Sequence, residues 1–96
     1  EMTNFEKGTI NLGPATKGDM LEARYRVISD RIVAGVSPSC GCTAASFSGK
    51  NVVLKYKVAA IPAHLGNIQK VSKFAIVKFT DGTVEKIYLN VTIIKG

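Results

Sequence analysis

The chain has 96 residues, with 46% apolar and 21% charged side chains, and these values are typical of one small globular domain. Two cysteines are too few for a fold built on disulfides, and no apolar run approaches the roughly 18–20 residues that cross a bilayer. We therefore expect a single domain over residues 1–96 without a transmembrane segment. The opening residues show no apolar leader, and the sequence leaves open whether one was removed.

The net charge of +6 arises from 13 lysines and arginines against seven acids, and it favours acidic partners. The basic residues are spread along the chain, mostly at alternate positions of the predicted strands, where a solvent-exposed sheet face accounts for them. They form neither the tight run nor the aromatic-interleaved motif that is typical of RNA-binding domains. The sequence therefore disfavours nucleic acid as a partner and leaves weak binding to acidic surfaces as a minor hypothesis.

The first part of the chain predicts short strands separated by turns. Residues 9–12 form a strand that Gly13-Pro14 ends, because proline donates no hydrogen bond to a ladder. Residues 20–28 and 51–58 alternate with the period of two that is typical of half-buried antiparallel strands. The side chains expected inside are Leu21, Ala23, Tyr25 and Val27 in the first of these, and Val52, Leu54, Tyr56 and Val58 in the second.

Two further segments lie between these alternating strands. Residues 31–36 predict a short strand that leads to the cysteines. Residues 43–49 are small and polar apart from Phe47, and they predict a loop.

The second part of the chain predicts a long hairpin. Residues 59–67 contain Pro62 and Gly66 and form a connection long enough to pass from one sheet to another. Residues 68–79 are rich in β-formers, with Ser72 as a point where the strand could be broken. Asp81-Gly82 predicts a type I′ turn into a return strand over residues 83–95. In that strand the side expected inside holds Ile87, Leu89, Val91 and Ile93.

The whole pattern indicates an all-β protein. About seven short strands, with turn signals roughly every 8–12 residues and no useful stretch of helical periodicity, predict a β-sandwich. A small β-barrel is the alternative architecture.

Short motifs in this chain resemble those of the DUF1573 family, a bacterial protein family of unknown function. The most distinctive is Cys40-Gly41-Cys42-Thr43, which looks like the CGCT motif of the family. The other matching elements are Phe5 in the opening segment, residues 10–18 with Leu12 where phenylalanine is usual, Ser48-Gly49-Lys50 with the strand at 52–56, and Gly66 with the strand at 74–77.

The resemblance implies a fold and a general role. The family is similar to immunoglobulin-like domains of the major-sperm-protein and ciliary ASH type. This implies an immunoglobulin-like antiparallel β-sandwich of about seven strands that serves as an adhesive or scaffolding module. Known members are often exported and lipid-anchored, and a small protein of this kind also resembles accessory proteins of phage capsids and tails. The resemblance therefore favours a virion or the bacterial cell envelope or periplasm as the location.

Cys40 and Cys42 are open to three interpretations. In an extended segment their Cα atoms would lie roughly 6.6 Å apart, so a disulfide would need a local kink, which Gly41 permits. The two thiolates could instead hold a soft metal ion, but tetrahedral zinc needs about four ligands and His64 is the only other good donor. The third interpretation treats both cysteines as small buried hydrophobes or surface thiols, and it is the one the ligand count favours.

The sequence contains no catalytic constellation, so we expect no enzyme, no cofactor and no metal site. His64 lies in a loop without a partnered carboxylate or a serine elbow, and a solvated histidine is the better interpretation. The seven acids are isolated from one another, and Asp19 and Asp81 have explanations as turn residues.

An exposed apolar strip is the other candidate feature. If Tyr88 and Ile94 face outward beside Val53, the three side chains would form such a strip, which usually marks a partner surface. The leading hypothesis is therefore a non-catalytic interaction module that contacts proteins of a larger assembly, such as a phage virion or cell envelope. Self-association into a homo-oligomer is compatible with it, and a small-molecule substrate is not expected. The alternative is a periplasmic or surface protein that handles thiols or metals with Cys40 and Cys42.

Overall fold

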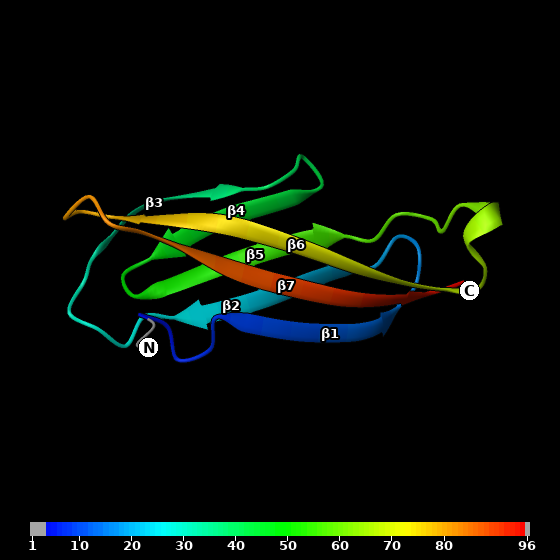
Figure 1. Cartoon of the computed structure of the whole chain (residues 1–96), viewed down its shortest axis with the longest axis horizontal. Helices are drawn as coiled ribbons and strands as arrows, with labels where there is room; N and C mark the ends of the chain where they lie inside the picture. The colour runs from blue at the N-terminus through cyan, green and yellow to red at the C-terminus, as the bar shows by residue number, and fades with distance from the viewer. Residues whose placement is uncertain (1–3, 96) are drawn as a thin grey trace.

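The computed structural model describes residues 4–95 of the chain. The first residues of the opening segment, in which the sequence shows no apolar leader, lie outside that part. It is a β-sandwich of seven strands in two sheets (Figure 1). One sheet has the strand order β1–β7–β6–β3 and the other the order β2–β5–β4. The strands are β1 (Thr9–Ala15), β2 (Met20–Arg26), β3 (Val33–Pro38), β4 (Thr43–Ser48), β5 (Asn51–Lys57), β6 (Ile68–Phe79) and β7 (Val84–Ile94), with a 3-10 turn η1 (Ala63–Leu65) before β6.

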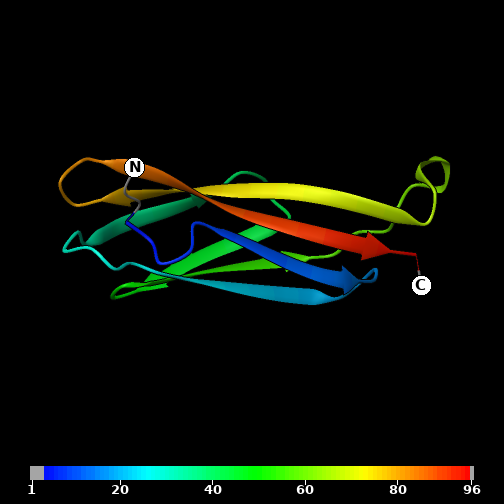
Figure 2. The same cartoon turned by 60° about the horizontal axis from the view of Figure 1, so that its bottom comes forward.

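The strand order is that of an immunoglobulin-like sandwich. The order β2–β5–β4 matches strands B–E–D of a constant-type immunoglobulin domain, and β7–β6–β3 matches strands G–F–C. The first strand joins the four-stranded sheet, where β1 runs parallel to β7, while the other strand pairings are antiparallel. Figure 2 shows the two layers, with β6 and β7 in one and β2 and β5 in the other. The predicted all-β sandwich is therefore confirmed.

The core lies between the two sheets, and the period-two pattern of the sequence places the side chains in it. The predicted inward positions of β2, β5 and β7 are buried or half-buried, as expected for half-buried antiparallel strands. Tyr25 ties the two layers together, because its hydroxyl donates a hydrogen bond of 2.7 Å to the main-chain oxygen of Tyr88 in β7. The largest fully buried side chains include Phe5, Tyr25, Leu54, Phe79, Ile87 and Leu89.

Three predicted boundaries were wrong. The predicted loop over residues 43–49 is strand β4, whose side chains are small apart from Phe47 but whose backbone pairs with β5 along its whole length. The extended segment β1 continues through Gly13-Pro14 to Ala15, with an irregular register there. Strand β6 is not broken at Ser72, which pairs with Asn90 of β7. In each case pairing with a neighbouring strand of the sheet decides the conformation.

The hairpin between β6 and β7 is confirmed, but its turn is not type I′. The Gly82 amide donates to the Phe79 carbonyl at 3.0 Å, and the Phe79 amide donates to the Thr83 carbonyl at 2.9 Å. Gly82 has φ +89°, whereas Asp81 does not have a positive φ. This is a type I turn followed by a left-handed glycine, which adds one residue to the loop. The extra residue shifts the register between β6 and β7 by one.

The connections also follow from the topology. Residues 59–67 cross from the three-stranded to the four-stranded sheet, as predicted, and include η1 with an exposed His64. Within residues 4–95, no helix has the length and apolar content to cross a membrane.

Candidate functional site

The outer surface of β6 and β7 is the strongest candidate for a functional site, and we call it the β6–β7 face. It consists of the side chains that alternate with the buried ones and point away from the core. No outward position of β6 or β7 holds a carboxylate. The face comprises the apolar side chains Ile68, Phe74, Ile76, Val84, Tyr88 and Ile94, the basic side chains Lys70, Lys78 and Lys86, and the polar side chains Ser72, Asn90 and Thr92.

Two aromatic rings and a lysine lie near the middle of this face. Phe74 and Tyr88 are direct cross-strand neighbours, with ring centroids 6.5 Å apart. The Lys86 ammonium lies 4.8 Å from the centroid of the Phe74 ring, within the range of a cation–π interaction. Tyr88 keeps 43% of its surface exposed. Phe74 is half-buried. An aromatic side chain that is held in place but still exposed, as Tyr88 is, is typical of the centre of a protein interface.

The position of Tyr88 is fixed from beneath the sheet. Its carbonyl accepts the hydrogen bond from the Tyr25 hydroxyl in the opposite layer. Burial raises the pKa of Tyr25 to about 12, so the hydroxyl keeps its proton and remains a donor at neutral pH. The backbone under the aromatic pair is thereby tied to the core.

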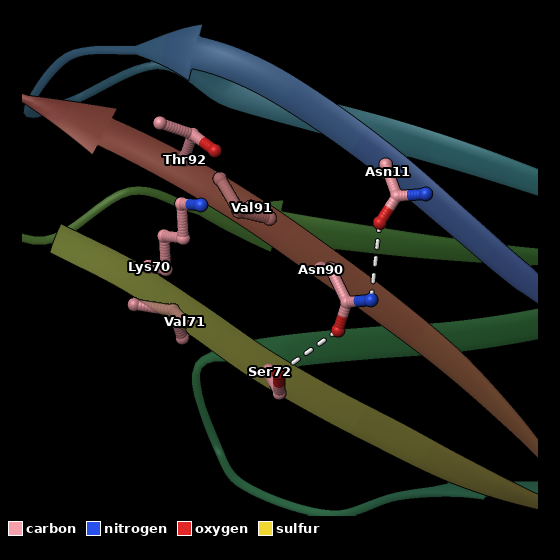
Figure 3. Close-up of a pocket in the computed structure, with 7 residues that line it drawn as sticks. All are labelled: Asn11, Lys70, Val71, Ser72, Asn90, Val91 and Thr92. Carbon is pink, nitrogen blue, oxygen red and sulfur yellow. Dashed lines mark hydrogen bonds between the residues drawn. The ribbon is translucent and has the colours of Figure 1, made fainter.

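The outward pair next to the aromatic rings is Ser72 and Asn90, which belongs to a polar ladder. Figure 3 shows this ladder and the residues that line a shallow groove beside it. The side-chain amide nitrogen of Asn90 donates to the side-chain oxygen of Asn11 in β1 at 3.0 Å. The side-chain oxygen of Asn90 accepts a hydrogen bond from the Ser72 hydroxyl at 2.8 Å. The groove has a volume of about 480 Å³ and is lined by these three residues together with Lys70, Val71, Val91 and Thr92. Its lining offers amide, hydroxyl and ammonium groups that can hydrogen-bond to a ligand, and no nucleophile paired with a base.

The prediction that Val53, Tyr88 and Ile94 form one exposed apolar strip was wrong. Tyr88 and Ile94 do face outward together on β7. Val53 faces outward from β5, which belongs to the other sheet, so it lies on the opposite side of the sandwich. Its cross-strand neighbours are Arg24 and Ser46, and that outer face is polar and charged.

Cys40 and Cys42 form a disulfide where the chain crosses from β3 to β4. Their Cα atoms are 5.5 Å apart, closer than in an extended segment, because the chain turns at Gly41. The interpretation of these residues as free thiols or buried hydrophobes was therefore wrong. Cys40 is half-buried and Cys42 is exposed, whereas Thr43 is buried with its hydroxyl 3.8 and 3.9 Å from the two sulfur atoms.

Hydrogen bonds anchor this crossover to both sheets. On the four-stranded sheet, the Ser39 amide donates to the Phe74 carbonyl at 2.9 Å. On the three-stranded sheet, the Lys57 amide donates to the Cys42 carbonyl at 3.4 Å. The disulfide is therefore held at a fixed place, beside the middle of β6 and the end of β5, rather than on a free loop.

The structure does not assemble a metal site from the predicted ligands. Among residues 4–95, no group of three or more histidine, cysteine or acidic residues lies close enough to hold an ion, so His64 does not join the two cysteines. The Asp81 carboxylate accepts hydrogen bonds within the turn between β6 and β7. The hydrogen bonds from Thr83, and next the one from Arg31, lower the pKa of Asp81 to about 2.

Comparisons with known proteins add no assignment. No family model matches the chain, and neither a curated protein nor a solved structure matches it. The resemblance to the DUF1573 family therefore stays a prediction.

Sequence reasoning missed most of the β6–β7 face. The sequence places Phe74 and Ile76 only in a strand, although the outward apolar residues at positions 68, 74 and 76 are a signal of an apolar outer face. Asn11 and Asn90 gave none, because their contact joins residues 79 positions apart.

Proposed function

We propose that this protein is a non-catalytic module that binds a protein partner of a larger assembly through the β6–β7 face. The observation that carries the proposal is the outward-facing Phe74–Tyr88 pair, in which Tyr88 is exposed and Phe74 half-buried, with Lys86 over the Phe74 ring and support from the core. An antiparallel sheet usually presents a polar outer face to water. An outer face with exposed aliphatic and aromatic side chains, such as Ile76 and Val84, is typical of a surface that is covered in its working state.

The charges on the face specify the chemistry of the partner. Lys70, Lys78 and Lys86 are accompanied by no outward acid on the same two strands. A partner with an apolar centre and an acidic rim would cover the aromatic pair and pair with the lysines. The net charge of +6 supports an acidic partner and opposes self-association.

The type of assembly is the less specific part of the proposal. The immunoglobulin-like strand order and the position of the CGCT segment at a sheet crossover are compatible with the resemblance to the DUF1573 family and to ASH-type scaffolding domains. We infer from that resemblance an accessory or decoration component of a phage virion or of the bacterial cell envelope.

Photo-crosslinking at one residue tests the proposal. A benzophenone amino acid replaces Tyr88 in the native host, and the matched control carries it at Val53 on the opposite outer face. The proposal predicts a discrete crosslinked protein from position 88 and none from position 53. Equal crosslinking from both positions, or none from position 88, would contradict it.

Thiol exchange is a second candidate function, because the disulfide is exposed at Cys42. A thiolate of a partner would attack the Cys42 sulfur, form a mixed disulfide with it and release Cys40 as a thiolate. Mass spectrometry of the protein in millimolar glutathione tests this candidate. A glutathione adduct on Cys42 supports it, whereas a fully retained Cys40–Cys42 bond contradicts it.

A further inference from the structure

The two sheets end in four edge strands, and three of these edges are protected against another chain. In β1, Pro14 has no amide to donate. In β2, charged side chains alternate along the strand, and the chain before β1 covers its end, where the Glu6 amide donates to the Arg26 carbonyl and the Asn4 carbonyl accepts from the Ile28 amide. In β3, the register is irregular and the strand ends at Pro38. Each of these features is a known means of blocking strand addition.

The fourth edge, β4, carries none of these features. Its six residues have the sequence Thr-Ala-Ala-Ser-Phe-Ser, without a charge or a proline. It pairs with β5 in a regular antiparallel register from Thr43 to Ser48. Figure 1 shows β4 beside β5, with β3 of the other sheet next to it in that view. A regular, uncharged edge strand is the kind that accepts another strand.

The pairing register identifies the free backbone groups. The Lys57 amide donates to the Cys42 carbonyl, so Cys42 and Lys57 form a hydrogen-bonded pair of the antiparallel ladder. Every second residue of β4 after Cys42 also belongs to a hydrogen-bonded pair with β5. The amides and carbonyls of Ala45 and Phe47 then point away from β5. Within residues 4–95, no hydrogen bond from outside the ladder reaches the backbone of these two residues.

We propose that β4 accepts an extended, acidic segment of a partner protein as an added strand. This inference rests on the proposed role as an interaction module but uses a different surface from the β6–β7 face. Main-chain hydrogen bonds to Ala45 and Phe47 would hold the segment. Lys55 and Lys57 on the adjacent strand β5, together with the net charge of +6, select an acidic segment over a second copy of this basic chain.

The test uses a capped peptide of about nine residues that alternates valine and glutamate and therefore favours an extended form. A control peptide has proline in place of each valine, so it carries the same charge but cannot form a ladder. NMR titration and amide hydrogen exchange are measured on the whole protein with each peptide at millimolar concentration. We expect the exchange of the Ala45 and Phe47 amides to slow by about tenfold or more with the valine peptide only.

Variants of β4 provide matched controls. Ala45→Pro removes a free edge donor while leaving the ladder to β5, and we expect it to weaken peptide binding by about tenfold or more. Ala44→Ser keeps both edge donors and is expected to bind within about twofold of the parent. Tyr88→Ala is also expected to bind the peptide normally, so this result is independent of the β6–β7 face.

Several results would overturn the inference. They are unchanged exchange at β4, equal effects of both peptides, and undiminished binding by Ala45→Pro. If that variant does not fold, the exchange data on the parent protein decide the question alone. A concentration-dependent dimer in sedimentation that protects the Ala45 and Phe47 amides without peptide would assign the edge to a second copy and overturn the acidic segment as the occupant.

Discussion

Replacing Tyr25 with phenylalanine tests the link between the core and the β6–β7 face. The ring is 1% exposed, and the substitution preserves it, so no cavity forms. It removes only the hydroxyl that donates to the Tyr88 carbonyl at 2.7 Å. A net hydrogen bond of this type contributes about 0.5–1.5 kcal/mol. We therefore expect Tyr25→Phe to lower the free energy of unfolding by about 1 kcal/mol at pH 7 in urea denaturation.

The pH dependence of the free energy of unfolding, compared between the parent protein and Tyr25→Phe, tests the same hydroxyl more specifically. Burial raises the pKa of Tyr25 to about 12, whereas an unfolded tyrosine titrates near 10. Between these values the unfolded state loses a proton that the folded state keeps, so stability falls as the pH rises. The parent protein should lose about 1.4 kcal/mol per pH unit relative to Tyr25→Phe in this range. The variant should therefore become the more stable protein before pH 12, and parallel profiles from pH 9 to 12 would refute the assignment.

Three further predictions concern stability. The double variant Cys40→Ser/Cys42→Ser should fold and lose only about 1.5 kcal/mol in urea denaturation, because the closed loop is so short, and a loss above about 4 kcal/mol would contradict this. Gly13→Ala should cost about 2 kcal/mol or more, since φ is +119° and the new Cβ would lie 2.5 Å from a main-chain oxygen of β7. Gly35→Ala, which has open space, should change the melting temperature little, and equal costs would refute the contrast. Asp81→Asn should lower the melting temperature at neutral pH. The difference should disappear as the pH falls from about 4 towards 2, because hydrogen bonds lower the pKa of Asp81 to about 2.

Local patterns in the sequence predict those parts of the fold in which side-chain burial alternates. Strands β2, β5 and β7 alternate clearly, and their inward residues were predicted correctly. Strand β4 was missed because its small side chains give no alternation, and its conformation depends on pairing with β5. Backbone pairing of this kind leaves little trace in composition.

The candidate site depends on register, which the sequence specified less well. A type I′ turn at Asp81-Gly82 would place Phe74 opposite Leu89, and the extra residue of the observed turn places it opposite Tyr88. The aromatic pair therefore follows from the type of one turn. The Val53 interpretation failed for a related reason, because the parity of a strand does not tell which sheet the strand joins.

The affinity of the crosslinked partner for face variants tests the central claim most directly. Tyr88→Ala and Phe74→Ala should each weaken binding by about 2 kcal/mol, or about thirtyfold, if the aromatic pair lies at the centre of the interface. The matched variant Val53→Ala on the opposite face should change binding by less than about 0.5 kcal/mol. Full binding by both aromatic variants, or an equal loss with Val53→Ala, would contradict a partner site on the β6–β7 face.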